Sequence, residues 1–252
     1  MSAMTVVGGS VAVWRLEQRL FWRNRALVVP TFLVPVAMCV SIPFTVPAGL
    51  DWDGVPYRGH FLTAMIAMIT VYSTFTTLVV TLTSRRDALI LKRLRGTELP
   101  NRSILAGNVL TAYVLSGLQL VLLLTIGLLA LGVPAPENPL LLMVALVYGT
   151  AVFAVLAAAY TALIPNAESA QILCIPVLFA CFACSGIFVP LSVFPDWLRT
   201  IAELLPVTAL ADAVRAAFYG GGALPRDAAV LGVWWAVGVI TTRRFFRWEG
   251  KR

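Results

Sequence analysis

The chain has 252 residues, of which 60% are hydrophobic and 12% are charged, and its nineteen basic residues outnumber twelve acidic ones. With a mean hydropathy of +0.88, it cannot be a soluble domain, because a soluble exterior needs more polar cover than this composition supplies. The lipid interior requires each span to satisfy its own backbone groups, so we predict an all-α polytopic membrane protein with about six transmembrane helices.

Residues 1–25 precede the apolar part of the chain and carry four arginines. Read as a helix, Arg15, Arg19 and Arg23 form one stripe at a spacing of four residues, with mostly apolar residues on the other side. This pattern predicts an N-terminal helix that lies in the membrane interface. A solvated basic lead-in fits the pattern equally well.

Five windows without Asp, Glu, Lys or Arg follow, and each is long enough for the roughly 20 apolar residues that a helical span needs. They cover residues 26–50, 59–84, 103–136, 138–167 and 169–195. A sixth, shorter window reaches that length if the residues on either side contribute, and it covers residues 228–242. These windows are the predicted spans.

Threonines recur on one helical face of the second window, at positions 63, 70, 74, 77 and 81. Such a stripe could face a cavity or a partner helix. Threonine hydroxyls can instead bond back to the carbonyl four residues earlier and have no other role. The residues that we consider for a substrate path are Thr70, Thr74, Thr77 and Thr81, with Gln171 from the fifth window.

Residues 84–102 interrupt the apolar windows with five arginines and one lysine. Leucines and an isoleucine are interleaved with these charges, and Gly96, Thr97 and Pro100 then break the helix. A short helix with basic and leucine faces can dock in a groove of a partner protein. The alternative is a topology signal that only contacts anionic lipid headgroups.

The basic residues also predict the orientation of the chain. With the N-terminus inside, the inside segments hold fifteen basic residues and the outside segments hold four. The positive-inside rule therefore places both termini and residues 84–102 in the cytoplasm. On the outside, the charges between residues 196 and 215 are too frequent for a full span.

The sequence offers no reaction chemistry of its own. It has no G-x-x-x-x-G-K-[ST] phosphate loop, and Cys181-x-x-Cys184 has no second ligand pair and is better explained by helix packing. We therefore predict no enzymatic activity and no catalytic residue, metal site or cofactor in this chain. The spans also lack the ionisable groups that ion-driven transporters use, so energy for uphill transport must come from another chain.

Three separated segments carry a family resemblance. The stretch LKRLRGTELP (91–100) resembles the L-x-R-L-R-x-T-P-L-P loop of ABC-2 type transport permeases, the membrane subunits of one class of ABC exporter. LIPNAESAQ (163–171) resembles that family's loop between spans four and five. Residues 185–221 are similar to its S-G-x-x-x-P-x-x-x-x-P-x-W-L and P-x-x-x-x-x-D-x-x-R motifs, and within the family the chain resembles drug and antibiotic exporters of the daunorubicin-resistance type.

The resemblance implies one membrane domain over residues 1–252 and a role for its segments. Residues 84–102 would form the coupling helix that seats on an ATP-binding subunit. Residues 187–222 would form two short helices that re-enter from outside, with an interfacial loop as the alternative. The implied contacts with the ATP-binding subunit are Arg86, Asp87, Leu91, Lys92, Arg93, Leu94, Arg95, Gly96, Thr97, Asn166 and Glu168.

The implied partners are a dimer of ATP-binding subunits, which would bind ATP and Mg, a second permease and membrane lipid, but no nucleic acid. The implied location is the bacterial cell (inner) membrane, as a multi-pass protein with both termini cytoplasmic. Almost charge-free spans favour a hydrophobic or amphipathic cargo, such as a drug, an antibiotic or a lipid. Export of a lipid-linked glycan and a non-transporting scaffold or immunity protein are the alternatives.

Overall fold

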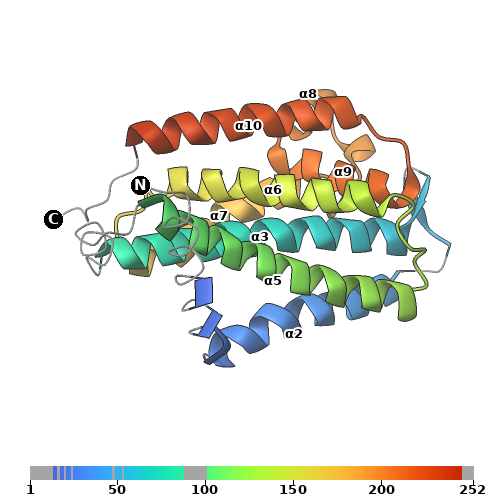
Figure 1. The fold of residues 1–252 in the computed structure, drawn as a ribbon. Helices are drawn as coiled ribbons and strands as arrows, with labels where there is room; N and C mark the ends of the chain where they lie inside the picture. The colour runs from blue at the N-terminus through green and yellow to red at the C-terminus, as the bar shows by residue number, and fades with distance from the viewer. Residues whose placement is uncertain are drawn as a thin grey trace.

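Six long helices form an elongated bundle in the described part of the chain (Figure 1). The structure, a computed structural model, describes residues 14–15, 18–19, 21–23, 25–46, 49–52, 54–87 and 101–245. The long helices are α2 (Arg25–Ser41), α3 (Tyr57–Asp87), α5 (Asn101–Leu129), α6 (Pro139–Tyr160), α7 (Ala167–Cys184) and α10 (Leu224–Phe245). The shorter elements are the 3₁₀ turns Ile42–Phe44 and Leu191–Val193, the strands β1 (Asp51–Trp52) and β2 (Val55–Pro56), and the helices α8 (Asp196–Glu203) and α9 (Pro206–Tyr219).

Successive long helices run in opposite directions along the bundle. In Figure 1, α3, α6 and α10 finish at the end where α2, α5 and α7 begin. Short connections between successive helices favour this antiparallel arrangement. This is the up-and-down arrangement expected from successive apolar windows that each cross the membrane.

Helix α3 lies at the centre of the bundle and contacts α5, α6, α7 and α9. Apolar side chains along its length, including Leu62, Met65, Ile66 and Leu78, are at most 2% exposed. Lipid tails are as apolar as leucine, so such helices associate through close packing and interhelical hydrogen bonds. A hydroxyl pair supplies one polar contact, with Oγ of Ser73 3.2 Å from Oγ of Ser116 on α5.

Two short helices fill the segment between α7 and α10, as the resemblance implied for residues 187–222. Pro195 precedes α8 and Pro206 begins α9, which suits proline because the first helical N–H has no partner within the helix. Helix α9 ends at Gly220, whose φ of 71° a residue with a side chain rarely adopts. Most of α9 is buried against α3, α6 and α10.

A two-stranded hairpin joins α2 to α3, and it was not expected from the sequence. Trp52 pairs with Val55 and Asp51 with Pro56, and Gly54 in the turn has a φ of 79°. The ring of Trp52 packs edge-on against Tyr57 at 4.8 Å between centroids. The hairpin thereby covers the first turn of α3.

Some predicted boundaries were wrong by a few residues. Helix α3 continues to Asp87, so the first residues of the predicted loop 84–102 form its last turn, and α5 already begins at Asn101. Residues 88–100 lie outside the described part of the chain. The described pieces of the predicted N-terminal helix are helical, and Trp22 there stacks on Phe32 of α2 at 5.9 Å.

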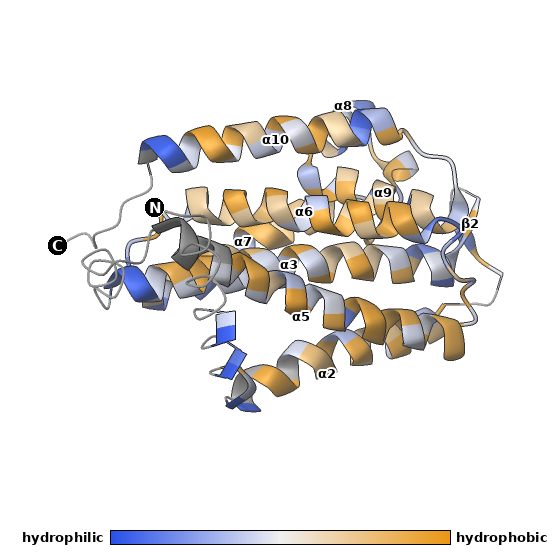
Figure 2. Cartoon of the chain, in the orientation of Figure 1, coloured by the Kyte–Doolittle hydropathy of each residue, from blue (hydrophilic) through white to orange (hydrophobic). Residues whose placement is uncertain are grey.

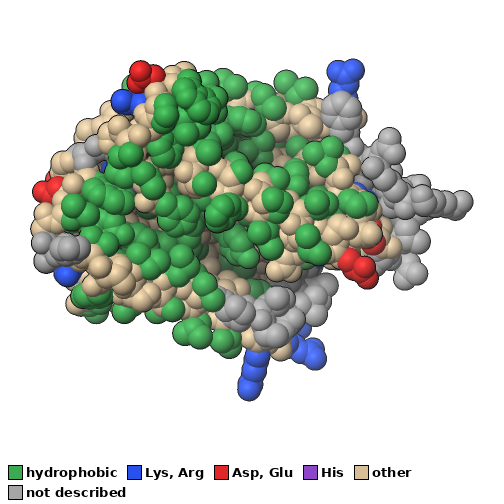
Figure 3. All heavy atoms as spheres, turned by 180° about the vertical axis from the view of Figure 1, so that it is seen from behind, with side chains coloured by type: hydrophobic (Ala, Val, Ile, Leu, Met, Phe, Trp, Pro, Cys, Tyr) green, Lys and Arg blue, Asp and Glu red, His purple; other side chains and the backbone are tan. Residues whose placement is uncertain are grey.

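Four described helices are long and apolar enough to cross a membrane: the full lengths of α3, α6 and α7, and Val109–Leu129 within α5. In α2 the apolar stretch is shorter, and α10 carries charged residues at both ends. The all-α membrane fold is therefore confirmed, whereas α2 and α10 stay predicted spans. Hydrophobic residues occupy the middle of the bundle in Figure 2, and a broad apolar face has its charges at the edges in Figure 3.

Replacing Gly149 of α6 by alanine is expected to destabilise the fold. The added methyl would lie 2.7 Å from a terminal carbon of Leu210, which is fully buried on α9. Overpacking of this kind costs about 1–3 kcal/mol, so the purified variant should unfold at a lower temperature in a thermal scan.

Gly117→Ala is the matched control for this substitution. Gly117 also lies within a long helix, but its added methyl would meet no atom of the described residues within 4 Å. We expect unchanged or slightly raised stability, because alanine favours the helix over glycine. Equal destabilisation by both substitutions would contradict the packing of α6 against α9.

Candidate functional site

Basic side chains gather where α3 and α10 finish. We call this the basic end of the bundle, and its arginines are Arg85 and Arg86 on α3 and Arg243 and Arg244 on α10. Figure 2 shows hydrophilic residues at these helix ends. The connection between α6 and α7, residues 161–166, lies at the same end and contacts α3.

Arg86 is the most buried of the four arginines described at the basic end, with 4% of its surface exposed. Its Nη1 donates to the carbonyl oxygen of Thr161 at 3.0 Å, and its Nη2 donates to those of Ile164 at 2.8 Å and Pro165 at 3.1 Å. Thr161 caps the C-terminal end of α6, and Ile164 and Pro165 lie in the connection beyond it, where carbonyls have no partner within a helix. The planar guanidinium can reach several acceptors at once because its donors point in fixed directions.

Asp87 contacts the other side of the same connection. Its Oδ2 accepts a hydrogen bond from the backbone N–H of Ala167, the first residue of α7. Its Oδ1 lies 3.5 Å from Nε of Arg86, an ion-pair distance. A carboxylate is favourable at this place, because the N-terminal end of a helix carries a partial positive charge.

Helix α7 is also capped by its own residues. Asn166 Oδ1 accepts from the backbone N–H of Ser169 at 2.9 Å and from its hydroxyl at 2.7 Å. Glu168 is exposed in the first turn, where its charge again suits the helix dipole. The start of α7 is therefore fixed by a cap and by Asp87.

The structure brings together four of the predicted contacts with an ATP-binding subunit. Arg86 and Asp87 at the end of α3 lie beside Asn166 and Glu168 at the start of α7, about 80 residues later in the chain. The remaining predicted contacts lie outside the described residues, and they are Leu91, Lys92, Arg93, Leu94, Arg95, Gly96 and Thr97.

The predicted substrate-path residues lie in different surroundings. Thr70 and Thr74 are buried within the chain, Thr77 and Thr81 are partly buried, and Gln171 is exposed on α7. The hydroxyl of Thr70 donates to the carbonyl of Ile66 at 2.8 Å, the local bond that was the alternative for this stripe. The hydroxyl of Thr74 has no hydrogen-bond partner among the described residues.

A polar pocket at the opposite end of the bundle was missed by the sequence reasoning. We call this the hairpin end, because β1 and β2 lie there. The pocket has a volume of about 240 Å³ and is lined by residues from five parts of the chain: His60, Ser185, Gly186, Pro190, Leu191, Ser192, Arg199, Glu203, Asp212, Arg215 and Arg226. Nε2 of His60 lies 3.2 Å from the carbonyl oxygen of Gly186.

Ion pairs in this pocket lie within α8 and within α9, and one joins α8 to α10. The carboxylate of Glu203 contacts Arg199 at 3.0 Å and Arg226 at 2.9 Å, and Asp212 pairs with Arg215 at 2.6 Å. Burial raises the pKa of Asp212, although the charge and the hydrogen bond of Arg215 oppose that shift. Spacings of three and four residues signal the two pairs within helices, whereas the contact between Glu203 and Arg226 depends on the packing of α8 beside α10.

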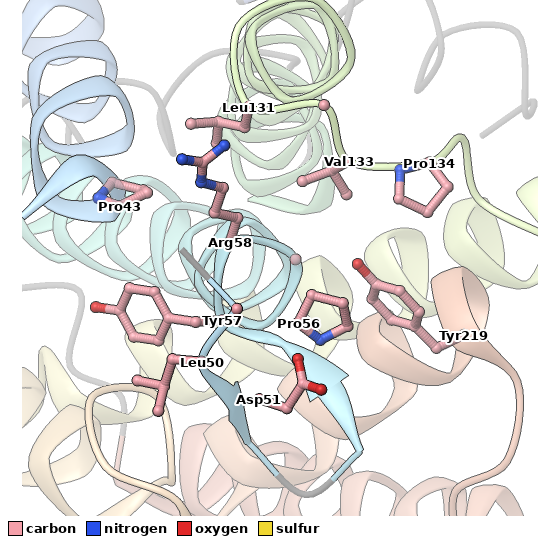
Figure 4. A pocket seen from close by; sticks show the side chains of 13 residues that line it. Pro43, Leu50, Asp51, Pro56, Tyr57, Arg58, Leu131, Val133, Pro134 and Tyr219 are labelled. Atoms are coloured by element: carbon pink, nitrogen blue, oxygen red, sulfur yellow. The ribbon is translucent and has the colours of Figure 1, made fainter. Parts of the chain in front are cut away.

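A second pocket of about 270 Å³ lies beside the hairpin (Figure 4). Side chains from the hairpin, the first turn of α3, the loop after α5 and the end of α9 surround it, with Asp51, Tyr57, Arg58 and Tyr219 as its polar members. The phenol of Tyr219 can approach α3 only because residue 59 is glycine, since an added methyl there would lie within 1.6 Å of its oxygen. Among the described residues, no group of three His, Cys, Asp or Glu side chains could hold a metal ion.

Comparison with protein families gives one match. The model of the ABC-2 type transporter family matches residues 10–219, which include both connections at the basic end as well as α8 and α9. A search of curated proteins found no match. Because the family match covers most of the chain, the protein belongs to the ABC-2 type transporter family.

Proposed function

We propose that this permease exports a hydrophobic or amphipathic substrate, such as a drug, an antibiotic or a lipid, with ATP hydrolysis in a separate subunit. The observation that carries the proposal is the arrangement of the basic end. There, residues 88–100 leave α3 directly after Asp87, whose carboxylate contacts α7. A partner that moves this segment would therefore act on several helices and not on one connection alone.

The charge pattern of residues 88–100 supports an ATP-binding subunit as that partner. The segment interleaves basic residues with leucines, which suits docking of a short helix in a groove. Its two ends are held by α3 and α5, so its position is tied to the bundle. ATP and Mg would be bound by the partner, and Lys92, Arg93, Arg95 and their leucine neighbours would face it.

The apolar helices support the proposal of a hydrophobic cargo and of an energy source outside this chain. The apolar windows that make up most of α3, α5, α6 and α7 hold no Asp, Glu, Lys or Arg, and the charges of these helices lie near their ends. Ion-driven transporters use such groups as ion and proton sites within their spans. A carrier built from these helices would instead depend on nucleotide-driven movement applied at the basic end.

A second permease is proposed to complete the transport path. Helix α7 keeps a row of large apolar side chains on its surface, with Ile172 70%, Ile175 56% and Phe179 69% exposed. Lipid and a second permease are both chemically suited to this row. In the bacterial cell (inner) membrane, a dimer would enclose a path that one chain does not provide.

Co-purification with a candidate ATP-binding subunit tests the proposal. We expect a stable complex whose ATPase activity is measurable in lipid. We expect Arg93→Ala with Arg95→Ala to lower both by about tenfold, because charge contacts at an interface contribute roughly 0.7 kcal/mol each. Arg243→Ala is the control, since this exposed arginine lies at the same end on α10.

The outcomes separate the candidate functions. A complex with equal activity in all variants would reduce residues 88–100 to a topology signal. If no ATPase binds a correctly inserted permease, a scaffold or immunity protein becomes the better description. If the complex forms but its ATPase activity responds only to a lipid-linked glycan, that cargo replaces the drug-like one.

The predicted orientation is tested by labelling single cysteines in a variant without the four natural ones. We expect Ser192→Cys, which is exposed near α8, to react with an impermeant maleimide in intact cells. Gly250→Cys near the C-terminus should react only after the cells are made permeable, because the positive-inside rule places the basic tail in the cytoplasm. The reverse pattern of labelling would contradict the proposed topology.

A further inference from the structure

We propose that Arg86 and Asp87 form a clamp that joins the end of α3 to the α6–α7 connection, so that movement of residues 88–100 is passed to α6 and α7. This inference rests on the proposed function, because it explains how a push from an ATP-binding subunit spreads through the permease. It assigns these two residues a positioning role within the chain.

The first half of the clamp is the buried guanidinium of Arg86. Its two terminal nitrogens donate to three carbonyl oxygens of residues 161–165, at distances between 2.8 and 3.1 Å. Hydrogen bonds from a charged donor are stronger than neutral ones, and a buried carbonyl that loses its donor is costly. Separation of α3 from the end of α6 would break all three bonds at once.

The second half of the clamp is the carboxylate of Asp87. It accepts from the N–H of Ala167, while the neighbouring guanidinium bonds the carbonyls on the other side of the connection. The two side chains therefore match the helix dipoles, with a cation at the C-terminal end of α6 and an anion at the N-terminal end of α7. Nε of Arg86 lies 3.5 Å from Oδ1 of Asp87, within the distance of an ion pair but without a hydrogen bond.

The burial of Arg86 separates its role from that of the later basic residues. Its terminal nitrogens are occupied by carbonyls of the same chain and only 4% of the residue is exposed. A partner subunit would have to break these bonds to reach the guanidinium. Contact with the partner therefore falls to residues further along the segment, and Arg86 and Asp87 carry the resulting movement inward.

Hydrogen exchange of the permease alone, in lipid nanodiscs, tests whether the clamp forms. The N–H of Ala167 reports directly on Asp87, so Asp87→Ala should accelerate its exchange by about tenfold or more, as expected when a charge-assisted bond is lost. Asp87→Asn should have a smaller effect because an amide oxygen can still accept. Unchanged exchange at Ala167 in Asp87→Ala would overturn the clamp, and this arm needs no ATP-binding subunit.

Exchange in the complete complex tests whether the clamp transmits movement. We compare complexes with ATP and vanadate against complexes without nucleotide, in wild type, Arg86→Gln and the control Arg243→Gln. We expect nucleotide to change exchange over residues 161–168 in wild type and the control, and this change to be lost in Arg86→Gln although the partner remains bound. A merely structural arginine would leave the nucleotide response in place.

The results with the complete complex separate failure of the clamp from failure of the proposed function. A nucleotide response that persists in Arg86→Gln and in Asp87→Ala overturns the clamp while leaving the exporter proposal intact. If wild type binds no ATP-binding subunit, the proposed function fails, and the inward transmission that rests on it fails with it. If Arg86→Gln does not insert, Asp87→Ala decides the question, because the side chain of Asp87 is 28% exposed and its loss leaves fewer buried groups unpaired.

Discussion

The burial of α3 among its neighbours is the constraint on which the rest of the structure depends. A helix surrounded by protein in a membrane gains little from the hydrophobic effect, so close packing and a few polar contacts must hold it. Small residues on the neighbouring helices permit that packing, as Gly127 of α5 does beside Leu62. Because α3 contacts α5, α6, α7 and α9, a displacement of its end at Asp87 cannot leave the other helices unaffected.

The two ends of the bundle are held in chemically different ways. At the hairpin end, ion pairs within α8 and α9 and one between α8 and α10 surround a polar pocket. At the basic end, one arginine and one aspartate bond backbone groups where α6 ends and α7 begins. Bonds to backbone groups do not depend on which side chains follow, so this connection can keep its geometry while the residues of segment 88–100 vary to suit a partner.

The charge-free apolar windows and their lengths predicted the helical membrane fold, because lipid restricts spans to apolar helices. The family resemblance of residues 185–221 predicted the region in which α8 and α9 lie. The hairpin was missed, since two-residue strands are too short to give a pattern. For the site, charge directed attention to residues 84–102, and the family resemblance directed it to Arg86 and Asp87. Neither could reveal that Arg86 turns inward, because its three acceptors are carbonyls 75 to 79 residues away.

The central claim is that the segment leaving α3 at the basic end meets an ATP-binding subunit. The most direct measurement is photo-crosslinking in intact cells from probes placed singly at Leu91 and Arg93, with a probe at Ser192 near the hairpin end as the control. We expect adducts with an ATP-binding protein from the first two positions and none from the third. Adducts with lipid alone from Leu91 and Arg93 would contradict it.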